Sequence, residues 1–111
     1  PVIVRNNIVE KWISLVELGS DSDNFPVRVY NNFVGGVSVS SSNYTEIFNN
    51  TVYHNSFYPI RILSTANEIK FLNNIVYADN PDYPALYIED IASIDTLNFN
   101  NLYLILILRR T

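Results

Sequence analysis

The segment Val27-Arg28-Val29-Tyr30-Asn31-Asn32-Phe33-Val34 decides the fold, and the segment Ile69-Lys70-Phe71-Leu72-Asn73-Asn74-Ile75-Val76 repeats its pattern. In both, apolar residues alternate with other residues over four positions, two asparagines follow, and two apolar residues complete the unit. Similar stretches occur at 2–9 and 45–52, and a looser copy ends at 100–103. One pattern therefore occurs five times in a chain of 111 residues.

Each copy predicts a strand, a sharp corner and a second strand. Alternating side chains point to opposite faces of a strand, and Val, Ile, Phe and Tyr favour strands. Asparagine tolerates the left-handed backbone region better than other non-glycine residues, so an Asn-Asn pair can bend the chain sharply. The apolar pair that follows begins the next strand.

The spacing of the asparagine pairs predicts a solenoid. The second asparagine of each pair stands at position 7, 32, 50, 74 or 101, so the intervals are 25, 18, 24 and 27 residues. Such intervals are typical of solenoids, in which each coil completes its core against its neighbours. Each interval also has room for a third strand, and we assign that strand to short apolar–polar–apolar segments: Ile13–Leu15, Val37–Val39, Ile60–Ile62 and Leu86–Ile88.

These features predict an all-β parallel β-helix of about four to five coils, each with three short strands and with an asparagine ladder at one corner. The sequence resembles the right-handed parallel β-helix (pectin-lyase-like) family, whose coils repeat an I-x-x-N-N-x-I theme and stack asparagines at a corner. The resemblance covers nearly the whole chain and implies right-handed winding. It implies little about function, because the family includes polysaccharide lyases, glycoside hydrolases, phage tailspikes and adhesins.

A leucine-rich repeat is the main alternative. The segment 27–34 matches the L-x-L-x-x-N-x-L core of that repeat, and so do 45–52 and 69–76. The repeat requires another apolar residue three positions earlier, where this chain has Asn24, Ser42 and Ala66. The segments between the copies also lack the 3.6-residue periodicity of a helix, which favours the β-helix.

The composition argues against several classes of function. Eleven acidic and seven basic residues are spread along the chain and leave a net charge of −4, whereas a nucleic-acid groove needs a clustered basic face. The absence of cysteine excludes a disulfide framework, a thiol nucleophile and a thiolate metal site. No apolar run approaches the ~18–20 residues of a membrane span. The only histidine, His54, provides neither a metal cluster nor a triad.

We expect no metal site and no cofactor in this chain. Asp21 and Asp23 lie in a polar segment, but the D-x-D-x-D-G spacing of a calcium loop is absent, so we interpret the segment as a solvated turn. The family resemblance leaves calcium open for a longer protein. We interpret residues 1–111 as one solenoid domain cut from such a protein, because the chain begins with Pro1 inside an expected strand and its end has no evident cap.

Stacking the copies in register would align Ile3, Arg28, Glu46 and Lys70 in one outward column. Neighbouring strands lie about 4.8 Å apart, so opposite charges on successive coils stabilise each other. We assign these charges to the fold rather than to a binding site.

The family resemblance implies a binding groove on the outer face of one sheet, beside the loops that lead into it. The matching outward column contains Ser14, Ser38, Arg61 and Tyr87, and the loops carry Phe57, Tyr58, Asp79, Asp82 and Tyr83. Aromatic rings stack on the apolar faces of sugars, while charged groups bind hydroxyls or uronates. We therefore predict four substrate-binding residues: Tyr58, Arg61, Tyr83 and Tyr87.

The candidate catalytic residues are Asp79, Asp82 and Arg61. Two carboxylates can form an acid–base pair, but a separation of three residues within a loop defines no distance between them. Trp12 has two interpretations, since it could pack at a coil corner or form a platform for a sugar ring.

Two functions remain open at this stage. The first is a carbohydrate-binding or polysaccharide-processing module of a secreted protein, with a polysaccharide or cell-surface glycan as partner. If that protein is an enzyme, the resemblance implies a polysaccharide lyase or glycoside hydrolase whose active site can lie in coils outside this segment. The second is a non-catalytic structural or adhesive solenoid. An extracellular or cell-surface location follows from the resemblance only.

Overall fold

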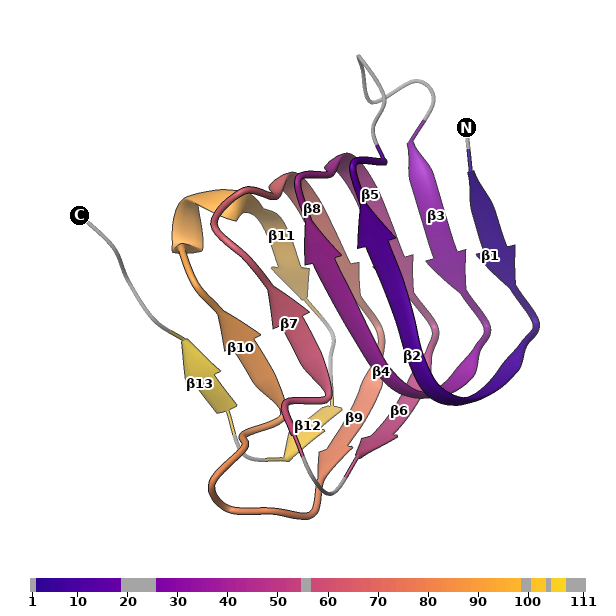
Figure 1. Ribbon diagram of the computed structural model, residues 1–111, viewed down its shortest axis with the longest axis vertical. Helices are drawn as coiled ribbons and strands as arrows, with labels where there is room; N and C mark the ends of the chain where they lie inside the picture. Colours follow the sequence, from indigo (N-terminus) through magenta and orange to yellow (C-terminus); the bar gives the residue numbers. More distant parts are fainter. Residues whose placement is uncertain (1, 19–25, 55–56, 99–100, 104, 108–111) are drawn as a thin grey trace.

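The chain winds as a parallel β-solenoid of about four turns (Figure 1). The structure is a computed structural model that describes residues 2–18, 26–54, 57–98, 101–103 and 105–107. Strands near the viewer in Figure 1 run upward and those behind run downward, while the chain advances from right to left, so the winding is right-handed. The all-β parallel solenoid predicted from the asparagine repeat is confirmed. The segment containing Asp21 and Asp23 lies outside the described residues, as does Asn100.

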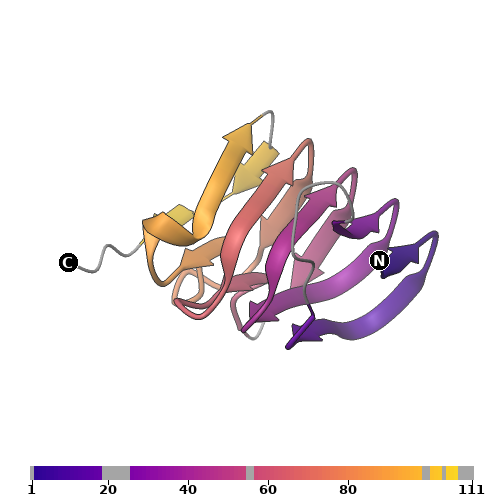
Figure 2. The ribbon, with the colours of Figure 1, turned by 90° about the horizontal axis from the view of Figure 1, so that it is seen from above.

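Two parallel sheets form the walls of the solenoid. The first sheet contains, in spatial order, β1 (Ile3–Arg5), β3 (Val27–Tyr30), β5 (Asn43–Phe48), β8 (Asn67–Leu72) and β11 (Ile94–Asn98). The second sheet contains β2 (Ile8–Val16), β4 (Phe33–Ser40), β6 (Thr51–His54), β7 (Ile60–Ile62), β9 (Ile75–Ala78), β10 (Leu86–Ile88), β12 (Asn101–Tyr103) and β13 (Ile105–Ile107). A 3-10 turn, η1 (Ile91–Ser93), precedes β11. Figure 2 shows successive coils side by side along the solenoid axis.

The first two coils differ from the expectation of three short strands per coil. In these coils the second and third strands are continuous, as β2 and as β4, and β4 pairs with both β6 and β7. The later coils divide at this position because residues 55–59 and 79–85 are inserted there, whereas β4 has only Gly35-Gly36. The expected third strands themselves are confirmed, since β7 and β10 have the predicted bounds.

The leucine-rich repeat alternative is wrong. The part of the chain that the structure describes contains no α-helix, and strands β7 and β10 occupy the segments between copies of the repeat. The absence of a 3.6-residue period in those segments was therefore the correct discriminator.

The second asparagines of the first four pairs form a ladder along the solenoid, and three of them are buried. Asn7 Nδ2 donates to Asn32 Oδ1 at 3.1 Å, Asn32 Nδ2 donates to Asn50 Oδ1 at 3.0 Å, and Asn50 Nδ2 donates to Asn74 Oδ1 at 3.0 Å. Asn32, Asn50 and Asn74 are almost inaccessible to solvent. Each side-chain amide thus provides a hydrogen-bond partner for the amide of the next coil. Polar groups are tolerated inside a core only when they have such partners.

The first asparagine of each pair forms the corner itself. All four described corner residues have φ between 55° and 57°, in the left-handed region: Asn6, Asn31, Asn49 and Asn73. Asparagine adopts this conformation more readily than other residues with a side chain, so the repeat supplies a bend in each coil without glycine. The register between coils is thereby anchored at the corner.

The core consists of apolar side chains stacked from coil to coil. Val29, Ile47 and Phe71 are in register across β3, β5 and β8, and all three are fully buried. The facing wall contributes Leu15, Val37, Val39, Ile60, Ile62, Leu86 and Ile88. This packing holds the two sheets rigidly and determines which side chains of each strand point outward.

The predicted charge column is confirmed in register. Arg28 lies opposite Glu46, and Glu46 lies opposite Lys70. Arg28 Nε and Glu46 Oε1 form an ion pair at 3.0 Å. Lys70 Nζ lies 3.8 Å from Asp95 Oδ2 in the following coil, because the register shifts between Ile94 and Thr96. This register shift is a bulge within β11.

Candidate functional site

The outward column predicted for the groove exists. Ser14, Ser38, Arg61 and Tyr87 are in register across β2, β4, β7 and β10. The residues before and after each of them are buried, so these four side chains lie on the outer face of the second sheet. The register between the coils positions Arg61 beside Tyr87.

Five aromatic side chains and Arg61 gather on this outer face, and we call the group the aromatic face: Trp12, Phe57, Tyr58, Arg61, Tyr83 and Tyr87. The ring centroid of Tyr58 lies 4.6 Å from that of Tyr87 and 5.2 Å from that of Tyr83. The ring of Phe57 contacts Tyr58 at 5.1 Å and Tyr83 at 5.2 Å. Every one of these side chains is partly exposed, so the cluster is a surface feature rather than a second core.

Arg61 lies within the aromatic face. Its Cζ atom is 4.9 Å from the centroid of the Phe57 ring, which is the geometry of a cation–π contact. No carboxylate of the described residues forms an ion pair with Arg61. The ring holds the planar guanidinium in place and its N–H donors remain available for a ligand.

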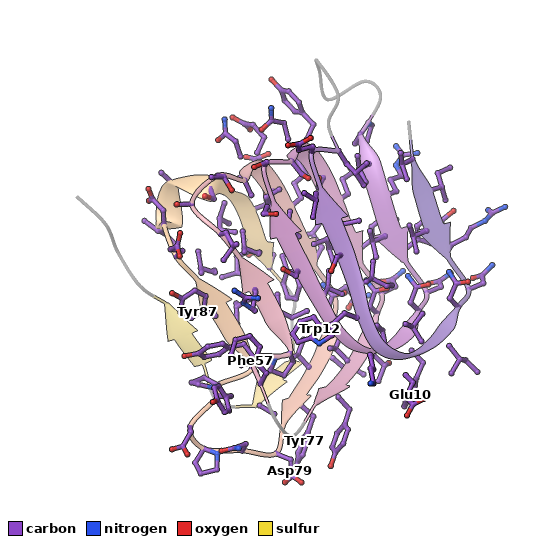
Figure 3. The ribbon with its side chains drawn as sticks, in the orientation of Figure 1. Glu10, Trp12, Phe57, Tyr77, Asp79 and Tyr87 are labelled. Carbon is purple, nitrogen blue, oxygen red and sulfur yellow. The ribbon has the colours of Figure 1, made fainter. Side chains whose placement is uncertain are left out.

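Trp12 joins the aromatic face from the first coil. Its ring covers Gly36, where an added Cβ would lie 2.6 Å from Trp12 Cε3, so only glycine leaves room for the indole. The ring also meets the edge of Phe57, with centroids 6.1 Å apart. Figure 3 shows Trp12, Phe57 and Tyr87 on the same side of the solenoid. Trp12 therefore packs against the sheet and at the same time extends the aromatic face.

The candidate catalytic residue Asp79 lies apart from the rings of the aromatic face. Asp79 Oδ2 accepts a hydrogen bond from Tyr53 Oη at 3.1 Å, and Figure 3 shows Asp79 beside Tyr77, away from Phe57 and Tyr87. This hydrogen bond raises the pKa of Tyr53 above its usual value, with smaller contributions from desolvation and from the Asp79 charge.

Asp82 is exposed in the loop after β9, where its N–H donates to Asn80 Oδ1 at 3.0 Å. That bond closes a local Asx turn and orders the loop that carries Tyr83. The catalytic roles of Asp79 and Asp82 stay predictions.

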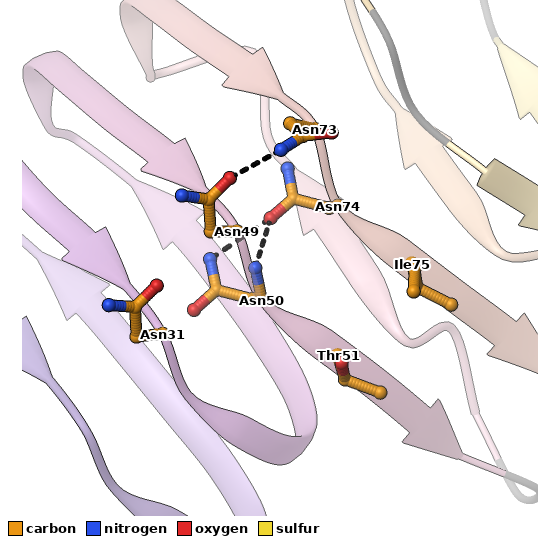
Figure 4. A pocket seen from close by; sticks show the side chains of 7 residues that line it. All are labelled: Asn31, Asn49, Asn50, Thr51, Asn73, Asn74 and Ile75. Atoms are coloured by element: carbon orange, nitrogen blue, oxygen red, sulfur yellow. Dashed lines mark hydrogen bonds between the residues drawn. The ribbon is translucent and has the colours of Figure 1, made fainter.

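An open depression of about 430 Å³ lies at the asparagine corner, and the sequence reasoning missed it. Figure 4 shows its lining: Asn31, Asn49, Asn50, Thr51, Asn73, Asn74 and Ile75. Asn73 Nδ2 donates to Asn49 Oδ1 at 2.6 Å across its rim. The Asn-Asn pairs were the available signal, but only their structural role was considered.

A second depression, of about 330 Å³, lies at the opposite corner between Asn43, Ser64 and Asp90. Both depressions offer hydrogen-bonding groups. Among the described residues, no three histidine, cysteine or acidic side chains are grouped so as to hold a metal ion. Within the same residues, no helix has the length and apolar character needed to cross a membrane.

The fold defines the class of this protein as a parallel β-solenoid. Comparisons with protein-family models, with curated proteins and with solved structures found no match.

Proposed function

We propose that this chain is the carbohydrate-binding part of an extracellular or cell-surface β-helix protein related to the pectin-lyase-like family. The aromatic face is the observation that carries the proposal. Partly exposed rings lie beside a guanidinium that contacts Phe57 and has no carboxylate partner among the described residues. Rings of this kind stack on the apolar faces of sugars, and a guanidinium binds hydroxyl or carboxylate groups of the same ligand.

The extent of the aromatic face supports a polysaccharide rather than a single sugar. The face spans β2, β4, β7 and β10, which at about 4.8 Å per strand corresponds to roughly 14 Å along the solenoid axis. Tyr58, Arg61, Tyr83 and Tyr87 are the binding residues in this proposal, with Trp12 and Phe57 beside them. A ligand lying along the axis would contact several of the rings.

A non-catalytic structural or adhesive solenoid is the second candidate. The hydrogen bond between Asp79 and Tyr53 favours it, because that carboxylate is engaged away from the aromatic face. If the protein is an enzyme, we expect a polysaccharide lyase or glycoside hydrolase in which Asp79, Asp82 and Arg61 are the residues to test first, with any calcium requirement belonging to the longer protein.

The test is affinity electrophoresis of the chain against a panel of neutral and acidic polysaccharides. Tyr87→Ala should weaken binding at least about tenfold, because a large aromatic side chain in a binding surface carries much of its energy. The matched control is Tyr30→Ala, which removes an equally half-buried tyrosine from the first sheet, where Tyr30 stacks on Phe48 at 4.8 Å.

The outcomes separate the two candidates. Binding that is lost in Tyr87→Ala and retained in Tyr30→Ala supports the carbohydrate function, and no binding by the wild type to any polysaccharide of the panel overturns it. Release of new reducing ends or of unsaturated products in the same samples would identify a hydrolase or a lyase. Binding without turnover supports a module whose catalysis, if any, lies elsewhere.

A further inference from the structure

A second surface of the solenoid is apolar although it faces solvent. We call it the apolar strip, and it contains Ile8, Phe33, Thr51, Tyr53, Ile75 and Tyr77. One row of it is in register across β2, β4, β6 and β9, in the order Ile8, Phe33, Thr51 and Ile75. Beside this row, the rings of Tyr53 and Tyr77 stack with centroids 5.4 Å apart.

The strip is exposed to solvent. Ile8 is 89% exposed, Phe33 56% and Ile75 49%, while Tyr53 and Tyr77 are 44% and 41% exposed. Beneath the row, Val34, Val52 and Val76 are buried in the core. Strands that are apolar on both faces are characteristic of sheets covered on both sides, whereas a sheet with one face in water carries polar residues on that face.

The area of the strip matches what a pair of copies needs. With about 200 Å² for each fully exposed large side chain, these exposed fractions leave roughly 560 Å² of the five apolar and aromatic residues open to solvent. Complete burial of these residues on both copies would remove about 1,100 Å² from water, which is close to the ~1,000 Å² expected of a specific interface.

The row is also complementary to itself when reversed. If a second copy faces the first with the order of its coils inverted, Ile8 meets the partner's Ile75 and Phe33 meets the partner's Thr51. Each large ring then lies over the smallest residue of the opposite row, so the two faces can interdigitate. This reciprocity, in which residue i contacts residue j and residue j contacts residue i, is the signature of an isologous two-fold interface.

We propose that two copies of this chain associate face to face through the apolar strip, related by a two-fold axis along the strand direction. Glu10 lies two residues after Ile8, and Asp79 lies two residues after Tyr77, so acidic groups stand at the two ends of the strip. In the reversed pairing Glu10 of one copy meets Tyr77 of the other, and Asp79 follows two residues later, so the two carboxylates face each other diagonally at the solvated rim. Salt screens this repulsion, and association should therefore tighten as ionic strength rises. The inference does not depend on the carbohydrate proposal, because the apolar strip and the aromatic face share no residue.

The test is sedimentation equilibrium of the chain over a range of concentrations, at low and high salt. An apolar interface near the lower size limit predicts a dissociation constant in the micromolar range, about 1–100 µM. Phe33→Thr removes the phenylalanine that faces Thr51 of the other copy. Thr51→Phe instead places a phenylalanine opposite Phe33 of the other copy. Either single change should weaken association at least about tenfold.

The exchange of the two residues provides the decisive variant. In the double variant Phe33→Thr/Thr51→Phe, the large residue again faces the small one, so association should return to within about threefold of the wild type. The control is Ile91→Thr, which removes an exposed apolar residue outside the strip and should leave association unchanged. Far-UV circular dichroism and the thermal midpoint report whether each variant is folded.

Three results would overturn the proposal. They are a wild type that remains monomeric at all concentrations, single variants that associate like the wild type, and a double variant no better than the singles. If the phenylalanine and threonine variants do not fold, Ile75→Lys tests the same strip by adding a charge to an exposed position. That variant should abolish association, and unchanged association would overturn the proposal.

Discussion

Replacing Asn50 by alanine should remove a large part of the stability of the solenoid. Asn50 Nδ2 donates to the Val29 carbonyl at 3.0 Å and to Asn74 Oδ1 at 3.0 Å, and Asn50 Oδ1 accepts from the Asn32 N–H at 3.1 Å. In Asn50→Ala the buried Asn32 N–H loses its acceptor and the Val29 carbonyl loses a donor. At about 1–3 kcal/mol for the buried N–H left without a partner and about 0.5–1.5 kcal/mol for the bond lost at the carbonyl, the free energy of unfolding should fall by about 1.5–4.5 kcal/mol.

The adjacent residue provides a matched control. Asn49 is exposed, and its side chain accepts one hydrogen bond, from Asn73 Nδ2 at 2.6 Å. Asn49 has φ of 55°, which glycine adopts without strain. Asn49→Gly should therefore reduce stability by about 1 kcal/mol or less, since it removes only a solvent-exposed bond.

Urea unfolding followed by circular dichroism gives the global free energy, and native-state hydrogen exchange gives the local one. We expect Asn50→Ala to lower amide protection first in β3, β5 and β8, where its partners lie. The ladder argument is refuted if Asn50→Ala and Asn49→Gly agree within about 0.5 kcal/mol, because burial would then contribute nothing to the difference.

Three further predictions concern other contacts. Gly36→Ala should displace the indole of Trp12, costing about 1–3 kcal/mol of stability and shifting the tryptophan fluorescence to longer wavelength; unchanged emission would contradict the packing. Tyr53 should ionise above the usual tyrosine pKa, and Asp79→Asn should lower that pKa in an alkaline absorbance titration. Because its folded-state pKa is raised, the contribution of Tyr53 to stability is complete below the unfolded pKa and is lost as pH rises through the folded value. Glu46→Gln removes an exposed ion pair and should cost under about 1 kcal/mol, with a smaller effect at high salt; a salt-independent loss would exclude a simple surface pair.

The register between coils was predictable because the residues that determine it lie close together in the sequence. Each Asn-Asn pair marks a corner by its own backbone preference, and counting back from that corner aligns Arg28 with Glu46. The apolar–polar–apolar segments that follow align Arg61 with Tyr87. Both alignments occur in the structure. The alternation of apolar residues then determines the buried face of each strand, so no contact between distant segments had to be guessed.

The positions of the bulge and of Asp79 were not predictable in the same way. The register shift near Asp95 depends on how the last coil packs on β8, and no residue type marks it in the sequence. The contact between Asp79 and Tyr53 joins residues 26 positions apart at the ends of β6 and β9. Asp79 was assigned to a loop beside Arg61, because a sequence position within a loop does not determine on which side of the sheet a carboxylate will lie.

The apolar strip was not predicted, although the sequence contains the pattern that produces it. The apolar pair after each Asn-Asn corner was interpreted only as the beginning of a strand, yet alternation requires that the first member of the pair point outward if the second is buried. Val34, Val52 and Val76 are the buried members, which left Phe33 and Ile75 facing solvent. The signal was therefore present in the repeat itself.

The repeat and the aromatic face carry different kinds of information. Whatever every coil shares, such as the corner, the ladder and the alternation, can be read by comparing the copies with one another. The aromatic face depends on what the coils do not share, because Phe57, Tyr58 and Tyr83 come from residues inserted between β6 and β7 and between β9 and β10. Binding surfaces commonly form in loops of this kind on a rigid scaffold. A test of function in this protein should therefore alter those insertions as well as Tyr87.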